Sequence, residues 1–339
     1  MTEQLENDYD VVVAGGGAAG LNGALMLARS RRTVVVIDAG RQRNAPADAV
    51  HGLLARDGIS PAELLETGRA EVRRYGGHVV SGEITAAARE GAGFVLTLAD
   101  GRTVRARRLL VTTGLTDELP DIPGLRERWG RDVVHCPYCH GWEVRDRAIA
   151  VLSRGPISMH QVQLFRQLSD DVVYFTHDQP DPTPEAAERL AARGVRVVPG
   201  KVTGIEITDD RITGIRLADG TDVAREVDAV GTHMVARSGF LDGLGLTAVD
   251  HPAGFGRYLT TDATGRTEVP GVWAAGNVTD VAAQVGAAAA AGATAGAQIN
   301  ADLVEAEFEH AVAERRAGFG TAGEAELAES VNASRGHGL

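Results

Sequence analysis

Cysteine is scarce in this sequence: the 339 residues include only two, Cys136 and Cys139. Two cysteines cannot form the framework of several disulfides that holds small secreted domains together, so stability must come from a packed apolar core. Aromatic residues are also few, at 4%, but hydrophobic residues make up 44% and charged residues 24%, as in soluble globular proteins. This length and composition predict about two folded domains and exclude a disordered chain or a single small module.

Positive charge is in deficit, with 34 Lys and Arg against 46 Asp and Glu and a net charge of -12. Such a chain repels polyanions, so we expect no nucleic-acid partner. Residues 1–10 are acidic and do not have the basic-then-apolar pattern of an export signal. The most apolar stretches, 11–27 and 281–299, consist largely of Gly and Ala and predict packed elements, not membrane spans. We therefore expect a cytoplasmic protein without a membrane partner.

The first forty residues have the pattern of a dinucleotide-binding unit. An apolar run at 9–14 leads into the glycine-rich residues 15–20, and a small-residue helical pattern follows. A second apolar run at 33–37 ends at Asp38. This order of strand, glycine loop, helix, strand and acid is typical of a dinucleotide site, although a glycine-rich turn in another α/β sheet remains an alternative.

Three glycines and the acid give this unit its predicted chemistry. Gly15 permits the tight turn, and Gly17 lets a pyrophosphate approach the backbone at the helix N-terminus. Gly20 allows close contact between helix and strand. Asp38 is placed to accept hydrogen bonds from ribose hydroxyls.

Two later segments look like further parts of the same unit, resumed after an insertion. Residues 108–114 predict a strand ending in a small-residue turn, and residues 270–277 predict another, followed by a helix from about 282 to 300. Turn-rich borders, which include Gly243 on the second side, could serve as linkers to the intervening piece. That piece contains one predicted hairpin at 205–223, and another is predicted at 94–104 around Asp100-Gly101. The predicted division is 1–117 and 246–303 for the first domain, 118–245 for the inserted domain, and 304–339 for an acidic tail with a short helix.

The two cysteines occur as Cys136-Pro137-Tyr138-Cys139, a spacing that allows a disulfide at the start of a helix. Backbone amides at such a position stabilise a thiolate, so the motif predicts a redox device. Zinc is an alternative because His135 and His140 flank the pair, yet adjacent residues seldom all reach one tetrahedral ion, and a second CxxC is lacking. Two inert buried cysteines are a further alternative.

Taken together, the glycine loop, the Thr113-Gly114 turn, the CxxC motif and the Gly276-Asn277 segment resemble the low-molecular-weight thioredoxin reductase family over residues 8–303. The resemblance implies an α/β fold of two Rossmann-like dinucleotide-binding domains, the second inserted in the first. It also implies FAD in the first domain, NADPH in the inserted domain and a homodimer. In that family the second thiol, here Cys139, faces the flavin, and the first, Cys136, exchanges with the substrate.

The resemblance also assigns the contacts to FAD, carried over residue by residue. Those near the ADP half include the three glycines and the acid discussed above, and those near the ribityl chain and flavin ring come from the last third. The predicted FAD-binding residues are Gly15, Gly17, Ala19, Gly20, Asp38, Ala39, Asn44, His51, Thr112, Gly114, Gly276, Asn277, Gln284 and Val285.

The sequence departs from the family at the expected NADPH site. Residues 153–158 stand where the family has GxGxxA, and the side chains of Ser153 and Ser158 crowd the close approaches that Gly and Ala would permit. The family's Arg pair for the 2'-phosphate is replaced by a segment that carries Asp178 and Asp181, which would repel a phosphate. We therefore expect NADPH binding to be weak or absent.

Two further departures lie at the reacting groups. His140 follows the second cysteine where the family has Asp, and an imidazole can take a proton from an incoming thiol near neutral pH. Alternatively, this histidine only hydrogen-bonds the backbone. Asn277 stands where the family has Asp, and its amide can still hydrogen-bond the ribityl chain.

With this motif and a degraded nicotinamide site, the sequence looks like the thioredoxin reductase-like dithiol oxidases that close the disulfide of small natural products of the gliotoxin and holomycin type. The resemblance implies a small-molecule dithiol as substrate, FAD as cofactor and O2 as acceptor, with H2O2 as product. The predicted catalytic residues are Cys136, Cys139 and His140. Two alternatives remain: a reductase of a protein disulfide that draws electrons from NADPH or a protein donor, and a non-enzymatic flavin or CxxC redox sensor.

Overall fold

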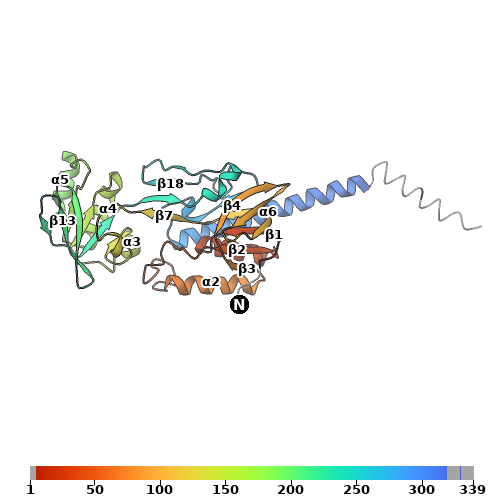
Figure 1. The fold of residues 1–339 in the computed structure, drawn as a ribbon, viewed down its shortest axis with the longest axis horizontal. Coiled ribbons are helices and arrows are strands. Elements are labelled where there is room, and N and C mark those ends of the chain that lie inside the picture. Colours follow the sequence, from red (N-terminus) through yellow and green to blue (C-terminus); the bar gives the residue numbers. More distant parts are fainter. Residues whose placement is uncertain (1–4, 319–328, 330–339) are drawn as a thin grey trace, which may run out of the picture.

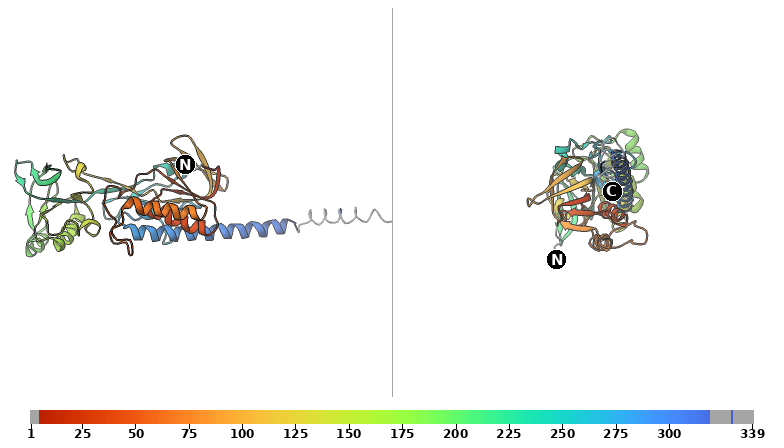
Figure 2. Two further views of the ribbon diagram at one scale, coloured as in Figure 1. Left: turned by 90° about the horizontal axis from the view of Figure 1, so that it is seen from below. Right: turned by 90° about the vertical axis from the view of Figure 1, so that its right-hand side faces the viewer.

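The computed structural model describes residues 5–318 and residue 329. Two α/β units lie along the long axis of an elongated molecule, and helix α6 (Val285–Gly318) projects from the end opposite the inserted unit (Figures 1 and 2). The predicted fold class, with the second unit inserted in the first, is confirmed.

The first unit is built on a seven-stranded sheet of order β3-β2-β1-β6-β5-β4, with β19 paired to β6. Its strands are β1 (Asp8–Ala14), β2 (Val34–Asp38), β3 (His78–Ser81), β4 (Ile84–Glu90), β5 (Gly93–Leu98), β6 (Thr103–Val111) and β19 (Val272–Ala274). Strands β1, β2, β3, β6 and β19 run parallel, and β4 and β5 are antiparallel neighbours. The predicted hairpin around Asp100-Gly101 is thus confirmed as β5 and β6.

Strand β1 explains why the first apolar run is continuous. Its alternate side chains point to opposite faces, and both faces are buried: Val11 and Val13 belong to one apolar core, Val12 and Ala14 to another. The first core lies under helices α1 (Ala18–Arg29), α2 (Pro61–Arg74) and α6, and the second includes the apolar residues of β5 and β6.

The inserted unit has a five-stranded parallel sheet of order β11-β10-β9-β15-β8. One face packs against the antiparallel strands β12, β13 and β14, which confirms the second predicted hairpin region, and the other face packs against helices α4 and α5. The bounds are β8 (Val133–Val134), α3 (Pro137–His140), β9 (Ile149–Leu152), α4 (Pro156–Leu168), β10 (Val172–Phe175), α5 (Pro184–Ala192), β11 (Arg196–Val198), β12 (Val202–Thr208), β13 (Arg211–Leu217), β14 (Asp222–Val223) and β15 (Val227–Val230).

A small four-stranded sheet carries the chain between the units. Strands β7 (Leu115–Glu118) and β16 (His233–Ala236) pair antiparallel and form the outward and return crossings, with β18 (Gly256–Tyr258) and β17 (Val249–Asp250) beside them. The short 3-10 helices are η1 (Arg126–Arg128), η2 (Gly239–Leu244) and η3 (Gly276–Val278).

The second domain border lies earlier than the predicted residue 245. Phe240 and Leu241 of η2 belong to the core of the first unit, although the sequence division assigned them to the inserted one. The glycines here were interpreted as a linker, but Gly243 serves close packing: a Cβ on it would lie 2.7 Å from the carbonyl oxygen of Ala87.

Helix α6 is longer than predicted. The sequence division placed the helix end near residue 300 and a separate short helix beyond, whereas one helix runs from Val285 to Gly318. Residues 301–317 contain no Gly or Pro and are rich in Ala and Glu, so nothing stops the helix. Glu307 also ties it to the first unit through Arg32 and Arg107. The rest of the predicted tail, apart from residue 329, lies outside the described residues, and among those described no helix combines the length and apolarity needed to span a membrane.

Candidate functional site

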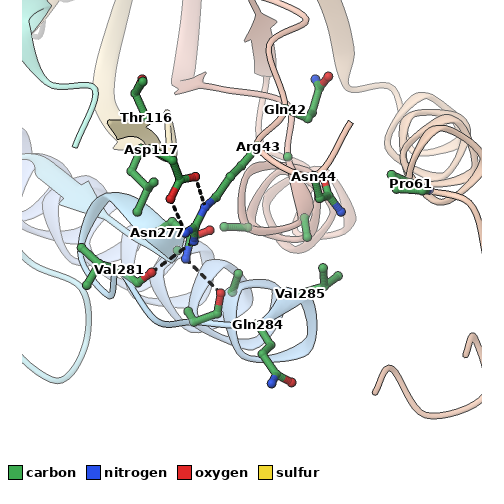
Figure 3. A pocket seen from close by; sticks show the side chains of 18 of the residues that line it. Gln42, Arg43, Asn44, Pro61, Thr116, Asp117, Asn277, Val281, Gln284 and Val285 are labelled. Carbon is green, nitrogen blue, oxygen red and sulfur yellow. Dashed lines mark hydrogen bonds and ion pairs between the residues drawn. The ribbon is translucent and has the colours of Figure 1, made fainter. Parts of the chain in front are cut away.

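A cavity of about 1490 Å³ lies between the two units and joins the predicted cofactor residues to the predicted catalytic residues. The first unit contributes the glycine loop, the Thr112–Gly114 turn and the start of α6, and the inserted unit contributes Cys136, Cys139 and His140. Every predicted site residue except Gly20 lines it. Figure 3 shows Asn44, Asn277, Gln284 and Val285 around the part of the cavity in the first unit.

The glycine loop has the geometry of an anion cradle. Gly15 has φ of +108°, and a Cβ there would lie 2.5 Å from the carbonyl oxygen of Thr112. A Cβ on Gly20 would lie 2.0 Å from the carbonyl oxygen of Gly15, so helix α1 can approach the strand only through glycine. By contrast, a Cβ on Gly17 would meet nothing within 4 Å. This open space lies at the N-terminus of α1, where free amides favour a phosphate, so the loop fits the pyrophosphate of a dinucleotide.

Asp38 lies at the end of β2 beside this loop. Its carboxylate accepts hydrogen bonds from the amide of Gly40 at 3.0 Å and from Nε2 of Gln42 at 3.0 and 3.1 Å. Arg69 pairs with Oδ2 at 3.0 Å. These contacts fix the carboxylate at the cavity wall, where an acceptor for ribose hydroxyls is needed.

The hydrogen bonds of Asn277 explain why an amide stands at this position. Its Nδ2 donates to the carbonyl oxygens of Asp280 at 3.0 Å and Ala283 at 2.9 Å. A carboxylate could not donate these bonds, so the amide stabilises the turn that leads into α6. The amide oxygen remains as the acceptor for a ligand in the cavity.

Arg43 and Asp117 form a pair at the cavity that the sequence did not reveal. Arg43 binds Asp117 through two hydrogen bonds of 2.7 Å and also donates to the carbonyl oxygen of Val281 (Figure 3). Burial raises the pKa of Asp117, but the hydrogen bonds from Arg43 and Thr232 outweigh burial and hold that pKa below its ordinary value. The two residues are 74 positions apart, and neither belongs to a motif, so no sequence signal indicated the pair.

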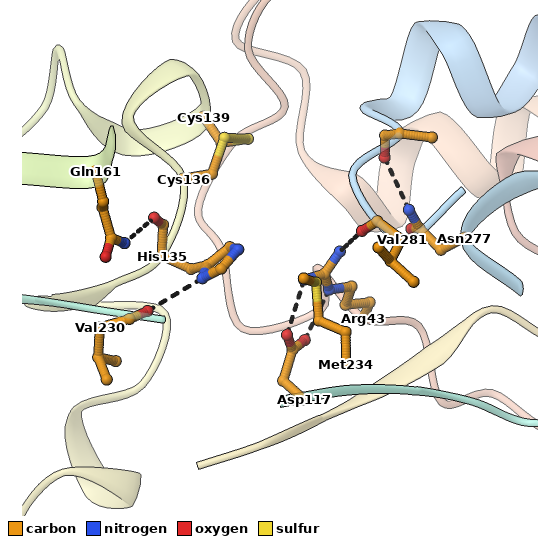
Figure 4. Close-up of a disulfide and its surroundings, with 11 residues drawn as sticks. Arg43, Asp117, His135, Cys136, Cys139, Gln161, Val230, Met234, Asn277 and Val281 are labelled. Atoms are coloured by element: carbon orange, nitrogen blue, oxygen red, sulfur yellow. Dashed lines mark hydrogen bonds and ion pairs between the residues drawn. A yellow bond between two sulfur atoms is a disulfide. The ribbon is translucent and has the colours of Figure 1, made fainter. Parts of the chain in front are cut away.

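Cys136 and Cys139 form a disulfide that bridges the first turn of α3. Figure 4 shows the disulfide on the inserted unit and Asn277 on the first unit, on opposite sides of the cavity. Within residues 5–318, no group of three His, Cys, Asp or Glu residues is arranged to hold a metal ion. The disulfide is the structural basis for the redox interpretation of the motif.

Two histidines flank the disulfide in different environments. His140 is half-buried at the cavity, and burial lowers its pKa, so the neutral imidazole is present at neutral pH. Burial also lowers the pKa of His135, whose Nδ1 contacts the carbonyl oxygen of Val230 at 3.0 Å. The side chain of His140 has no such backbone contact in the described part of the chain and lines the cavity.

In the loop between β9 and α4, two serines make hydrogen bonds within the inserted unit. The hydroxyl of Ser158 accepts a hydrogen bond from the backbone amide of Arg154 at 2.8 Å and contacts the carbonyl oxygen of Leu152. The hydroxyl of Tyr174 donates to Ser153 at 2.8 Å. Both serines are buried. The amide of Arg154 is thus already bonded, whereas a Cβ on Gly155 in the same loop would meet nothing within 4 Å.

Comparison with known proteins gives consistent matches. A family model of pyridine nucleotide-disulphide oxidoreductases matches residues 9–295. The chain is 32% identical to thioredoxin reductase tcpT of Claviceps purpurea over 312 residues, which cover 88% of this chain and 96% of that protein. It is 29% identical to thioredoxin reductase sirT of Leptosphaeria maculans over 317 residues, with coverage of 88% and 96%.

Solved structures agree with these matches. The crystal structure of HlmI is 44% identical, with a TM-score of 0.87 and coverage of 94% of this chain and 100% of that one. An oxidoreductase from Agrobacterium tumefaciens is 34% identical, with a TM-score of 0.82 and coverage of 88% and 99%. The resemblance indicated by the motifs is therefore confirmed.

Proposed function

The chain belongs to the pyridine nucleotide-disulphide oxidoreductase family and is thioredoxin reductase-like, and from this premise we propose that it is an FAD-dependent dithiol oxidase. It converts a small-molecule dithiol to an intramolecular disulfide. One observation carries the proposal: the Cys136–Cys139 disulfide and His140 line the same cavity as the glycine loop and Asn277.

The thiol chemistry follows from the three residues of the inserted unit. Neutral His140 takes the proton from the first substrate thiol, and the resulting thiolate attacks the sulfur of Cys136. The Cys136–Cys139 bond breaks, and Cys139 leaves as a thiolate. The second substrate thiol gives its proton to water or to the Cys139 thiolate and attacks the substrate sulfur of the mixed disulfide, which releases Cys136 as a thiolate. The substrate is now a disulfide, and the enzyme holds two reduced cysteines.

Cys139 and Cys136 must then lose two electrons before another turnover. When bound, FAD would supply the two-electron chemistry that passes these electrons from the cysteines to O2, which gives H2O2. The residues that would hold it are those of the glycine loop, Asp38, Asn277 and the start of α6, and their geometry fits a dinucleotide.

NADPH is not part of the proposed cycle. Ser158 bonds the loop amide of Arg154, and the segment after β10 presents His177 and Asp178 where a phosphate clamp would need cations. Burial also lowers the pKa of His177, so this side chain is neutral at neutral pH.

The size of the cavity supports a small-molecule substrate over a protein substrate. Ligand pockets usually measure roughly 300–1000 Å³, and the cavity of about 1490 Å³ is large enough for a cofactor and a second small molecule beside the disulfide. We also propose a cytoplasmic homodimer, on the family resemblance and because closed two-fold pairs are the commonest oligomers. A role in making or detoxifying a sulfur-containing natural product belongs to the same proposal.

The test is turnover in air without nicotinamide. The FAD-loaded protein is mixed with dithiothreitol as a small dithiol, and O2 uptake, H2O2 and the cyclic disulfide are measured together. We expect all three in equal amounts, and near-complete loss of turnover in Cys136→Ser and Cys139→Ser variants. Absence of O2 uptake and of disulfide product in the wild-type protein would contradict the proposal.

A reductase is the second candidate, because the relatives tcpT and sirT are both named thioredoxin reductase. Such an enzyme would run the thiol steps in reverse and draw electrons from NADPH. It predicts NADPH-dependent reduction of a disulfide such as that of thioredoxin, with little O2 uptake from the dithiol alone.

A further inference from the structure

A contact between a histidine and a carboxylate joins the two units near the disulfide. Nε2 of His51, from the first unit, lies 3.4 Å from Oε1 of Glu143, which follows α3 in the inserted unit. Nδ1 of the same imidazole lies 3.5 Å from Oδ1 of Asp57. Asp57 is held in turn by the backbone amide of Gly52, at 2.9 Å. One imidazole therefore lies between two carboxylates, one from each unit.

The loop that carries His51 is packed against the inserted unit at a second point. A Cβ on Gly130 would lie 2.8 Å from Cβ of Pro46, so these backbones approach as closely as glycine allows. Gly130 also has φ of +82°, which a side chain rarely adopts. The His51–Glu143 contact is thus part of a close packing between the units.

The same charges surround His140. Burial lowers the pKa of this imidazole, the carboxylate of Glu143 raises it, the charge of His51 lowers it, and Asp48 raises it. Another titratable side chain, His160 of α4, lines the same cavity. Of these groups Glu143 is the largest electrostatic influence on His140, and it is also the group that contacts the other unit.

Resting on the proposed function, we propose that Glu143 and His51 are positioning residues for His140. Glu143 stabilises the imidazolium that forms when His140 takes the proton of the substrate thiol. His51, anchored by Asp57, holds Glu143 in place across the boundary between the units. The base is therefore completed only when the inserted unit lies against the first unit.

The proton balance is simple. The first substrate thiol loses a proton to His140, and the substrate sulfur uses the electron pair of its former S–H bond to form the bond to Cys136. Cys139 leaves as a thiolate with the electron pair of the broken Cys136–Cys139 bond. The positive charge on His140 lasts until the proton passes to water or to the Cys139 thiolate. During that interval the neighbouring carboxylate lowers the free energy of the charged imidazole.

The first test measures the pKa of His140 directly. The ring resonances are followed by NMR in the oxidised, FAD-loaded protein as pH varies, with His140→Gln for assignment. In Glu143→Gln we expect the pKa of His140 to fall by about half a pH unit, the size of a partly exposed ion pair. Asp170→Asn is the matched control, because Asp170 is an exposed carboxylate of the same unit paired only with Arg166 among the described contacts. An unchanged pKa in Glu143→Gln would overturn the proposal.

A double-mutant cycle tests the role of His51. If His51 holds Glu143, the effect of Glu143→Gln on the pKa of His140 should shrink by at least about half in a His51→Gln background. Shifts that simply add would overturn this part. Neither measurement depends on turnover, so both remain decisive if the dithiol oxidase proposal fails.

Kinetics supply the second readout. For the neutral base to act, His140 must be deprotonated, so a lower pKa moves the acid limb of the kcat/KM profile to lower pH. We expect this shift in Glu143→Gln, together with a roughly three- to tenfold lower plateau, and partial rescue by Glu143→Asp. A lower plateau with an unmoved limb would mean a purely structural role. Wild-type protein that does not oxidise dithiols at all would contradict the proposed function and not the electrostatic coupling.

Discussion

The two nucleotide-binding units of this protein have the same strand, loop and helix, and in both a Cβ on the glycine at the helix start, Gly17 or Gly155, would meet nothing within 4 Å. The loops differ in the partners of their amides. At the start of α1, Gly17 leaves open space in front of the helix N-terminus. At the start of α4, the hydroxyl of Ser158 binds the loop amide of Arg154. The backbone path is shared, and the small residues decide whether its amides remain free for a phosphate. In the second loop, one amide is therefore held by a side chain of the protein itself.

The two units also differ in what their cores bury. Both faces of β1 are covered by apolar residues. In the inserted unit, Asp228 of β15 is 1% exposed, and both carboxylate oxygens have no hydrogen-bond partner within the described residues. Burying this carboxylate costs the inserted unit free energy of folding, and the size of that cost depends on pH.

The largest expected effect comes from adding a side chain at Gly20, where α1 lies against the glycine loop. In Gly20→Ala the new Cβ would lie 2.0 Å from the carbonyl oxygen of Gly15, so α1 must shift. We expect the free energy of unfolding to fall by more than about 3 kcal/mol and bound FAD to fall at least about tenfold. Denaturant unfolding and flavin absorbance measure these. Gly204→Ala is the control, because a Cβ there meets nothing within 4 Å. A Gly20→Ala variant with full FAD content would contradict the account of the loop.

A smaller effect is expected from Asp228→Asn. Burial raises the pKa of Asp228 from 3.8 to about 7. Between these values the unfolded chain has released the proton that the folded chain keeps, so stability falls as pH rises through this window. At pH 8 the variant should be more stable than wild type by roughly 2–3 kcal/mol. Its stability should also depend less on pH between about 4 and 7.

Urea unfolding at several pH values measures this effect. A matched control is Asp170→Asn, which removes an exposed carboxylate of the same unit and should leave the pH dependence unchanged. If the Asp228 variant keeps the wild-type pH dependence, the carboxylate is not protonated in the folded protein.

The smallest effect is expected from Ser158→Ala, which removes the hydroxyl that bonds the amide of Arg154 in the second loop. The amide of Arg154 loses its partner, so the free energy of unfolding should fall by about 1–2 kcal/mol. NADPH binding by calorimetry should remain undetectable, because Asp178 still stands where a phosphate clamp would be needed. Unchanged stability would show that the Ser158 hydrogen bond does not stabilise the loop.

The sequence alone predicted the structure of the first loop, because the residues that define it are close together in the chain. The continuous apolar run of β1, the three glycines and Asp38 all lie within one strand–helix–strand unit, where pattern and spacing determine the fold. Ser153 and Ser158 stand at positions where the pattern needs glycine and alanine, so the departure of the second loop was also visible in the sequence; its effect on NADPH binding stays a prediction.

The contacts across the cavity could not be predicted in this way. Arg43 and Asp117 are far apart in the chain, as are His51 and Glu143, and the second pair also joins the two units. Gly243 was interpreted as part of a linker because glycine serves flexible turns and close packing equally well. Long-range packing, not local propensity, determines these features.

The most direct test of the account is the source of the electrons that reduce the bound flavin. The FAD-loaded protein is mixed under strict exclusion of oxygen with either dithiothreitol or NADPH, and flavin absorbance is followed in a stopped-flow instrument. The account predicts that the dithiol bleaches the flavin, that Cys136→Ser abolishes this bleaching, and that NADPH leaves the flavin oxidised. Bleaching by NADPH at a rate equal to or greater than that of the dithiol would contradict it.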